Sequence, residues 1–370
     1  MISPPIDLET IKRVLVIKLR HFGDVLLTTP VFSALQKALP NACIDAMIFK
    51  ETAPMLEGHP AINAMHFCDP AWKKLSRLPR LKKEIEFLRS IRKQKYELVI
   101  NLTEGDRGSI ACYISNARYR VGWDPGKKGI FKKDRLYTHV VKKPNTDRHV
   151  VELNLDTLRR IGIYPEIYER KLQFYTTLHA KTRIDELLSI HRIKDYILVH
   201  PTSRWLFKSL PVKTIAQVVD RLHAMGHTII ITASSNEREI KYVQDVKKLT
   251  SNFLDLTGQI NLKELGALIE HSQLFIGVDS APMHLACALQ KPVVALFGPT
   301  SEKAWGPWYG LTSSIQYIIM SHDPGCRPCG LDGCGGGKVS DCLTALTPES
   351  IVNAAFRLLS KNHYQLSIMS

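Results

Sequence analysis

The chain has 370 residues, enough for two ordinary domains, and its 45% hydrophobic content is typical of globular proteins with full cores. No uncharged apolar run is long enough to span a membrane, and the first ten residues lack the basic start and apolar stretch of a secretory signal, so we expect a cytoplasmic protein. The formal net charge is +15, of which +12 falls in residues 1–175. This asymmetry indicates an anionic partner for the first half of the chain.

Strands and helices alternate in the first half. We predict strands at 14–19, 43–49 and 98–102 and helices at 24–39, 80–95 and 150–161. Pro30 predicts a break within the first helix. The second predicted helix, 80–95, is amphipathic, with expected core residues Leu81, Ile85, Leu88 and Ile91. Segment 120–148 is rich in Gly, Lys, Pro and Asn and predicts an irregular loop.

The second half shows a more regular alternation after a linker near 174–180 and a short helix. We predict strands at 196–200, 228–232, 253–256, 274–278 and 293–297, and helices at 212–225, 236–248, 262–271 and 282–289. This pattern indicates a parallel, doubly wound α/β sheet.

A last helix begins at Thr347-Pro348-Glu349, where an N-cap residue, a proline and an acidic residue follow one another. We therefore expect an α/β protein with domains at 1–175 and 176–345 and a helix at 346–370 that packs back on the first domain. Two open α/β domains in tandem predict a ligand cleft between the carboxyl ends of their strands.

Residues 277–286, with the sequence GVDSAPMHLA, form the most informative segment. The apolar run before Asp279 reads as a buried strand, and a helical pattern begins at Ala281-Pro282. Such a junction presents backbone N–H groups and the positive end of a helix dipole, which favour anionic groups such as diphosphates. The alternative is an ordinary turn in which Asp279 or Ser280 caps the helix.

Two further segments belong with this one: RHFGDVLLTTP at 20–30 and HPTSRWLFKSLP at 200–211. Together the three resemble the ADP-heptose:lipopolysaccharide heptosyltransferases, a family of metal-independent sugar-nucleotide glycosyltransferases. The resemblance extends from about Val14 to about Leu359, and the opening segment is most similar to heptosyltransferase III of the inner core. It implies the GT-B fold, with two Rossmann-like doubly wound domains facing a central cleft. It places the acceptor in the N-terminal domain and the nucleotide sugar in the C-terminal one.

Asp24 follows Gly23 at the start of a predicted helix. Its position alone is that of a helix N-cap, which contributes about 1 kcal/mol. The resemblance implies instead that it is the general base that takes the proton of the acceptor hydroxyl, a role that accelerates reactions by roughly 10²–10⁴-fold. The family inverts at the anomeric carbon, which requires one base and a stabilised leaving group.

The resemblance also implies a donor site in the second domain. Lys208 matches the lysine that neutralises the departing diphosphate, although its loop position alone favours a solvated lysine. Pro282 removes one N–H from the junction at 279–284, so the N–H groups of Ser280 and Ala281 are the expected donors. An acidic or polar residue after the strand at 228–232 is expected on the ribose or heptose, as either Asn236 or Glu237. The full expected donor set is Thr202, Ser203, Lys208, Asn236, Glu237, Asp279, Ser280, Ala281 and His284.

The eight cysteines fall into two sets. Four are scattered among apolar neighbours and are expected to be core residues of a reducing compartment: Cys43, Cys68, Cys112 and Cys287. The other four lie within 17 residues, at Cys326, Cys329, Cys334 and Cys342. They are compatible with a structural zinc site, and the alternative is a set of free or redox-active thiols.

The basic excess is densest at 72–95 and 126–143. Five of these basic residues are expected to contact the acceptor or the membrane: Lys73, Lys74, Arg77, Lys82 and Lys83. A solvated helix face is the plain alternative. Both the anionic inner face of the cytoplasmic membrane and the phosphates of the lipopolysaccharide inner core would explain a positive acceptor domain.

The expected function is transfer of heptose from ADP-heptose to a heptose of the lipopolysaccharide inner core, with no cofactor required. An alternative keeps the same site and uses another nucleotide sugar. A basic nucleic-acid-binding protein is a further alternative, but the chain has no motif with aromatic stacking positions, and its charge avoids the cysteine-bearing half. We therefore expect no nucleic-acid partner.

Overall fold

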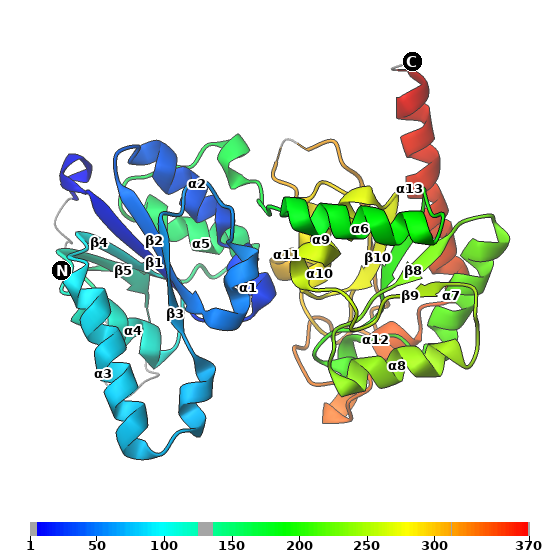
Figure 1. Ribbon diagram of the computed structural model, residues 1–370, viewed down its shortest axis with the longest axis horizontal. Coiled ribbons are helices and arrows are strands. Elements are labelled where there is room, and N and C mark those ends of the chain that lie inside the picture. The colour runs from blue at the N-terminus through cyan, green and yellow to red at the C-terminus, as the bar shows by residue number, and fades with distance from the viewer. Residues whose placement is uncertain (1–5, 125–135, 312, 369–370) are drawn as a thin grey trace. The chain divides into compact units, whose positions relative to one another are not determined.

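The computed structural model describes residues 6–124, 136–311 and 313–368 (Figure 1). The chain forms two compact units. Unit 1 contains residues 1–173 and 310–312, and unit 2 contains residues 174–309 and 313–370. Each unit is built on its own parallel sheet.

The sheet of unit 1 has six parallel strands in the order β3-β2-β1-β4-β5-β6. They are β1 (Arg13–Lys18), β2 (Cys43–Phe49), β3 (Ala64–Cys68), β4 (Leu98–Asn101), β5 (Tyr119–Trp123) and β6 (His139–Val141). Val14 of β1 is in register with Ile44 on one side and Leu98 on the other. Strands β2 and β3 thus lie on one side of β1, and β4, β5 and β6 lie on the other. The topological switch point is between β1 and β4.

Helices cover both faces of this sheet (Figure 1). They are α1 (Phe22–Leu26), α2 (Thr29–Ala38), α3 (Arg77–Lys93), α4 (Asp106–Ile114) and α5 (Val150–Arg159), with 3₁₀ turns at Leu8–Thr10, Lys50–Met55, Pro70–Lys74 and Ile167–Arg170. Helix α2 packs with α5, and α3 packs with α4. The predicted break near Pro30 is confirmed, because α1 ends at Leu26 and α2 begins at Thr29, with Pro30 in its first turn.

Three expectations for unit 1 are wrong. Cys43, expected in the core, is exposed because it is the first residue of β2. The segment 120–148 contains β5 and β6 rather than loop alone, although residues 125–135 lie outside the described part. These strands are short. Position 122 in β5 requires glycine, because a Cβ atom there would lie 2.3 Å from the Tyr137 ring. In α3, Leu81 and Ile85 are 56% and 38% exposed instead of core-facing. The helix reaches the core only through its C-terminal half, where Ile91 is buried.

Unit 2 repeats the architecture with the strand order β12-β11-β10-β7-β8-β9, all parallel. The strands are β7 (Ile197–His200), β8 (Ile229–Ile231), β9 (Leu254–Asp255), β10 (Leu274–Val278), β11 (Val293–Leu296) and β12 (Tyr317–Met320). Leu274 of β10 is in register with Ile197 of β7, so this sheet's switch point lies between β7 and β10. The sequence pattern had predicted all of these strands except the edge strand β12.

The helices of unit 2 are α6 (Leu178–Ile190), α7 (Val212–Ala224), α8 (Glu237–Lys247), α9 (Leu262–His271), α10 (Ala281–Ala288), α11 (Glu302–Trp305), α12 (Asp341–Thr344) and α13 (Pro348–Ile368), with 3₁₀ turns at Leu206–Lys208 and Cys334–Gly336. Helices α7, α8 and α13 share one apolar core with the sheet, whereas α9 packs with α6 and α10. Helix α13 contacts α7 and the strands β10, β11 and β12 of its own unit. The expected packing of this helix on the first domain stays a prediction.

None of the helices in the described ranges is both long enough and apolar enough to cross a membrane.

A buried carboxylate links the first three strands of unit 1. Asp45 of β2 accepts hydrogen bonds from Tyr96 (2.6 Å), Asn63 (2.9 Å) and Arg13 of β1 (3.2 Å), while His66 of β3 lies 3.7 Å away. Burial alone would raise the pKa of Asp45. The nearby His66 and the hydrogen bonds from Tyr96 and Asn63 outweigh that effect and hold the pKa below its usual range. Ionised Asp45 therefore stabilises the folded unit.

We predict that Asp45→Asn lowers the free energy of unfolding by about 3 kcal/mol at pH 7, because a buried charge network loses its anion. A depressed folded-state pKa gives stability that is present above the unfolded pKa of about 3.9 and lost as the pH falls below it. The difference between the two proteins should therefore shrink below about pH 4. Urea unfolding followed by circular dichroism at neutral and acid pH measures it. A difference that stays constant with pH would contradict this assignment.

Candidate functional site

Loops from three strands of unit 2 meet at the switch point of the sheet. Lys208, after β7, places Nζ 2.6 Å from Oδ2 of Asp279, which follows β10. Thr300, after β11, donates its hydroxyl to the same oxygen at 2.5 Å. Asp279 is 6% exposed and the Lys208 side chain 17%, so the pair is largely shielded from water. The structure thus brings together two predicted site residues, and it adds Thr300, which the sequence analysis missed.

The start of α10 lies directly after Asp279. Ser280 is the N-cap residue, but its hydroxyl donates to the carbonyl of Val278 at 3.2 Å and does not cap the helix. The first N–H groups of a helix have no acceptor within the helix, and they carry the positive end of its dipole. Ala281 is the first helical residue, as the motif predicted. His284 lies one turn further in and is 2% exposed.

A buried carboxylate that the sequence analysis did not select lies beside this loop system. Glu239, in the first turn of α8, is 5% exposed. It accepts hydrogen bonds from the hydroxyls of Thr202 and Ser234, both at 2.6 Å. Glu239 lies three residues after the Asn236 N-cap, the spacing of a capping box. This spacing is the sequence signal that could have drawn attention to Glu239. Instead of capping its own helix, Glu239 fixes the loops after β7 and β8.

The remaining expected donor residues make local contacts. Asn236 caps α8 by accepting from the N–H of Arg238 at 3.0 Å, and Glu237 is exposed in the first turn. The Ser203 hydroxyl donates to the carbonyl of Trp205 at 2.8 Å. These contacts give Asn236 and Ser203 structural roles. Their contact with a donor molecule stays a prediction.

Two aromatic residues continue the loop that carries Lys208. Trp205 stacks on Phe207 with ring centroids 6.2 Å apart, and the Trp205 side chain is 48% exposed. Under the loop, His200 is buried with Nδ1 2.9 Å from the Thr232 hydroxyl. Burial lowers the pKa of His200 to about 4, although the nearby Glu239 charge opposes this effect. His200 is therefore neutral at physiological pH and stabilises the loop by hydrogen bonding.

The segment 326–342 borders the same loops. The Arg327 guanidinium, 5% exposed, donates to the carbonyl of Gly298 at 2.7 Å and pairs with Glu302 at 2.9 Å. The Ser340 hydroxyl donates to the carbonyl of Phe207 at 2.6 Å. This segment therefore links the loop that carries Lys208 with the loop that carries Thr300.

The four cysteines of this segment differ in environment. Cys342 is buried, Cys329 is half-buried, and Cys326 and Cys334 are exposed. Within the described parts of the chain, no group of three or more His, Cys, Asp or Glu residues is placed to hold a metal ion. The arrangement lends no support to the zinc site, which stays a prediction.

The corresponding edge of unit 1 carries Asp24. It is half-buried and occupies the third position of α1, while His21 is the N-cap residue, so the alternative role of Asp24 as N-cap is wrong. Lys18 ends β1, is 7% exposed, and donates Nζ to the carbonyl of Leu102 at 3.3 Å. Burial lowers the pKa of Lys18, and the negative charges of Asp24 and Glu104 act against that shift. Lys18, which the sequence analysis did not select, thus shares the electrostatic environment of Asp24.

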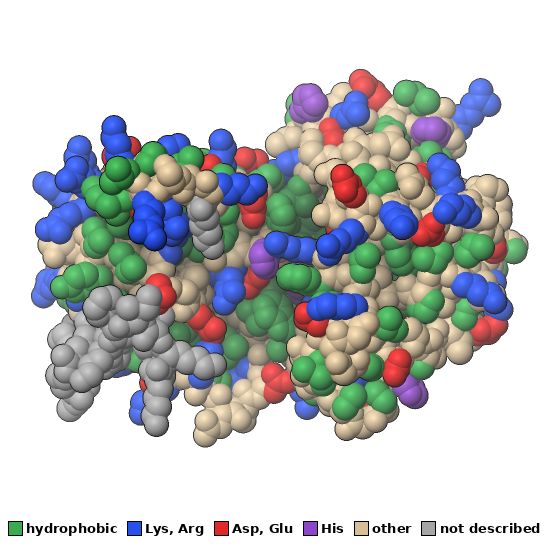
Figure 2. All heavy atoms as spheres, turned by 90° about the horizontal axis from the view of Figure 1, so that it is seen from below, with side chains coloured by type: hydrophobic (Ala, Val, Ile, Leu, Met, Phe, Trp, Pro, Cys, Tyr) green, Lys and Arg blue, Asp and Glu red, His purple; other side chains and the backbone are tan. Residues whose placement is uncertain are grey.

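The predicted basic surface lies on unit 1. Lys74 ends a 3₁₀ turn just before α3, and Arg77, Lys82 and Lys83 lie in the first half of α3, all with exposed side chains. Lys73 belongs to the same turn. Figure 2 shows Lys and Arg side chains gathered on the part of the surface that unit 1 contributes, with hydrophobic side chains between them.

Two doubly wound parallel sheets, each with charged side chains at its switch point, define a two-domain α/β transferase of the GT-B class. Comparison with known proteins agrees. The family model of glycosyltransferase family 9 (heptosyltransferase) matches residues 85–333. The chain belongs to glycosyltransferase family 9.

Individual relatives support this assignment. The chain is 33% identical over 292 residues to lipopolysaccharide heptosyltransferase 3 of Escherichia coli, covering 78% of this chain and 84% of that protein. Its fold is similar to a family 9 glycosyltransferase of Veillonella parvula, with a TM-score of 0.77, 24% identity, and coverage of 95% and 97% of the two chains. The ADP-heptose lipopolysaccharide heptosyltransferase II of E. coli gives a TM-score of 0.74 at 19% identity, with coverage of 95% and 99%.

Proposed function

We propose that this protein transfers heptose from ADP-heptose to a heptose of the lipopolysaccharide inner core, with inversion at the anomeric carbon. Family membership and the E. coli relatives named for this activity support the substrates. The observation that carries the proposal is the Lys208–Asp279–Thr300 cluster at the switch point of unit 2, beside the start of α10. Cations and a helix N-terminus at such an edge suit a nucleoside diphosphate.

On the donor side, the proposed reaction breaks the bond between the anomeric carbon and the diphosphate oxygen. Negative charge then accumulates on the departing ADP. The Lys208 ammonium and the first N–H groups of α10 stabilise that charge, so no divalent metal is needed. The hydroxyls of Thr202 and Ser203 are held by Glu239 and Trp205, which fixes the shape of the loop around the diphosphate. Asn236, Glu237 and His284 are the remaining proposed donor contacts.

On the acceptor side, Asp24 is the proposed general base. An acceptor hydroxyl gives its proton to the Asp24 carboxylate while its oxygen forms the new bond to the anomeric carbon from the side opposite ADP. The transition state resembles an oxocarbenium ion, as in glycoside hydrolysis. The buried Lys18 side chain shares this electrostatic environment, and the charge of Asp24 acts against the lowering of the Lys18 pKa by burial. The proposed site of action is the inner face of the cytoplasmic membrane, where basic residues of unit 1 meet anionic lipid.

Neither alternative function gains support. Another nucleotide sugar would fit the same strand edge, but the two E. coli relatives reported above are named as heptosyltransferases. The nucleic-acid alternative has no family match to support it, whereas the family model spans more than half of the chain.

We predict that the purified protein transfers heptose from ADP-heptose to truncated inner-core lipopolysaccharide in the presence of EDTA, with the product detected by mass spectrometry. Calorimetry should rank ADP above UDP and GDP as ligands. Tighter binding of UDP or GDP would favour another donor. Activity that is lost in EDTA and restored by magnesium or manganese would contradict the metal-independent mechanism.

We predict that Asp24→Asn lowers turnover by about 10²-fold or more while ADP affinity stays within about twofold, because the base acts only on the acceptor proton. Steady-state kinetics and calorimetry measure the two effects. Asp24→Glu is the matched variant, since it keeps the charge but moves it, and it should retain part of the activity. Near-normal turnover in Asp24→Asn would contradict the role of general base and would leave Asp24 only the stabilisation of the α1 helix dipole.

We predict that replacing Lys73, Lys74, Arg77, Lys82 and Lys83 with Gln weakens binding to anionic vesicles and raises the KM for acceptor. The attraction acts over about 8 Å at physiological salt, so wild-type binding should weaken as salt rises. ADP affinity should stay nearly unchanged, because the donor contacts lie on the other unit. Vesicle co-sedimentation and calorimetry test this, and unaltered vesicle and acceptor binding would show that the charges are only a solvated face.

A further inference from the structure

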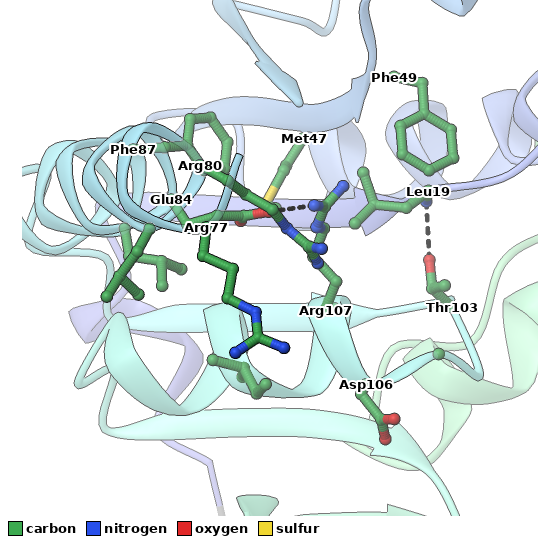
Figure 3. A pocket seen from close by; sticks show the side chains of 15 residues that line it. Leu19, Met47, Phe49, Arg77, Arg80, Glu84, Phe87, Thr103, Asp106 and Arg107 are labelled. Atoms are coloured by element: carbon green, nitrogen blue, oxygen red, sulfur yellow. Dashed lines mark hydrogen bonds and ion pairs between the residues drawn. The ribbon is translucent and has the colours of Figure 1, made fainter. Parts of the chain in front are cut away.

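Unit 1 contains a pocket of about 820 Å³, and Arg77 is the member of the proposed acceptor and membrane set that lines it. It lies between α3 and α4 at the carboxyl edge of the sheet, as its lining residues Leu19 after β1 and Thr103 after β4 indicate (Figure 3). A volume of this size is that of a small-molecule site. The apolar core residues beneath it, such as Met47 and Leu19, belong to the cluster that α3 and α4 cover.

One part of the wall of this pocket is apolar and suits a hydrocarbon chain. Its apolar lining is provided by Leu19, Met47, Phe49, Leu81, Phe87 and Leu88. The lining includes one hydroxyl, that of Thr103, and this hydroxyl already accepts the N–H of Leu19 at 2.7 Å. Polar groups that face these apolar side chains would lose their hydrogen-bond partners, which costs free energy, whereas an acyl chain would not.

The same pocket has a cationic side. Arg77, Arg80 and Arg107 line it, and the first two have exposed side chains. Arg107 forms an ion pair with Glu84, and Figure 3 shows these guanidinium groups close to one another. One glutamate cannot neutralise three guanidinium groups. The Asp106 carboxylate, also in the lining, is turned away from them (Figure 3). The pocket therefore has an excess of positive charge.

A backbone element adds to this positive side. Helix α4 begins after Gly105, which provides no side-chain cap, and Gly108 lies in its first turn. At Gly108 a Cβ atom would lie 2.6 Å from Oδ1 of Asn101, so this close approach to β4 requires glycine. The start of α4 therefore lines the pocket beside the arginines, and its positive dipole end favours a phosphate, although the Asp106 carboxylate in the first turn acts against that effect.

The pocket opens onto an apolar surface. Leu78, Leu81 and Ile85 recur along α3 and are 80%, 56% and 38% exposed, and Ile110 of α4 is 43% exposed at the lining. Around them, α3 carries seven basic residues and two glutamates. Exposed leucines among basic side chains are typical of helices that lie at an anionic lipid surface.

We propose that this pocket binds one acyl chain of an anionic membrane lipid, with the chain between α3 and α4 and the phosphate on Arg77, Arg80 and the start of α4. The surface of α3 then lies on the bilayer, and the bound lipid anchors the acceptor domain there. The inference rests on the proposed function only in its membrane setting, since lipid binding requires neither heptose nor ADP.

Calorimetry with dodecyl phosphate below its micelle concentration tests the site in the full-length protein. Each buried methylene strengthens binding about fourfold, so dodecyl phosphate should bind at least about 50-fold more tightly than butyl phosphate. Neutral dodecyl maltoside should bind about 10-fold more weakly than dodecyl phosphate, because two guanidinium groups lose their anion. Equal affinity of the long and short phosphates, or of the charged and neutral amphiphiles, would overturn the proposal.

Single variants locate the site. Arg80→Gln and Ile110→Gln should each weaken dodecyl phosphate binding about 10-fold, and both positions are exposed enough to preserve folding. Arg92→Gln on the same helix and Leu178→Gln on unit 2 lie outside the pocket and are matched controls with unchanged binding. An equal loss of dodecyl phosphate binding in either control variant would overturn the assignment of the site to this pocket.

Photo-crosslinking tests the site in the wild-type protein, so its result does not depend on the folding of any variant. Dodecyl phosphate with a terminal diazirine should label residues of α3, α4 and 47–49 in the wild-type protein, and labelling elsewhere would overturn the site. Co-sedimentation with phosphatidylcholine vesicles should require added phosphatidylglycerol and should weaken in Arg80→Gln. Heptose transfer without lipid binding would overturn this inference alone, and lipid binding without transfer would overturn only the proposed function.

Discussion

Parallel strands end at the same edge of a sheet, and this constraint brings the functional side chains of each unit together. In unit 2 the loops after β7, β10 and β11 end at that edge, so Lys208, Asp279 and Thr300 meet although they are far apart in sequence. In unit 1 the same rule brings Lys18 and Asp24, after β1, close to Glu104, after β4. Because the chain diverges at each switch point, neighbouring loops separate there and leave room for a ligand.

The Lys208–Asp279 pair has a consequence for donor binding under the proposed function. A buried ion pair gains little net stability, because desolvation of both charges offsets their attraction. A diphosphate that approaches the start of α10 offers Lys208 a stronger anionic partner, while Thr300 continues to satisfy Asp279. The pair thus holds the ammonium in position before the donor arrives. Arg327 and Ser340 support this geometry by joining the loops that carry Thr300 and Lys208.

The two units use charge over different distances. Unit 1 carries most of the net charge, and its basic residues on α3 are exposed, so their attraction is long-ranged and sensitive to salt. In unit 2 the charges at the strand edge, Lys208 and Asp279, are paired and largely buried, so they act over hydrogen-bond distances. This division suits an acceptor held at an anionic surface and a donor that is bound from solution. Under the proposed membrane contact, the exposed leucines of α3 would lie on lipid and need not be buried in the core.

The sequence by itself determined the strand and helix pattern of unit 2, because long apolar strands alternate there with helices of clear period. It also determined the motifs at 20–30, 200–211 and 277–286, since chemistry restricts the residues at strand ends. It did not reveal β3, β5, β6 or β12, and β5 and β6 were hidden by a segment whose Gly, Lys, Pro and Asn content is typical of a loop. It placed Leu81 and Ile85 in the core, because periodicity shows that a helix has an apolar face but not what covers it. Only the tertiary structure decided that Glu239 holds Thr202, that Thr300 and Arg327 support Asp279 and its loops, and that α3 and α4 enclose a pocket. These are contacts between residues distant in the chain, which depend on strand order and helix placement rather than on local pattern.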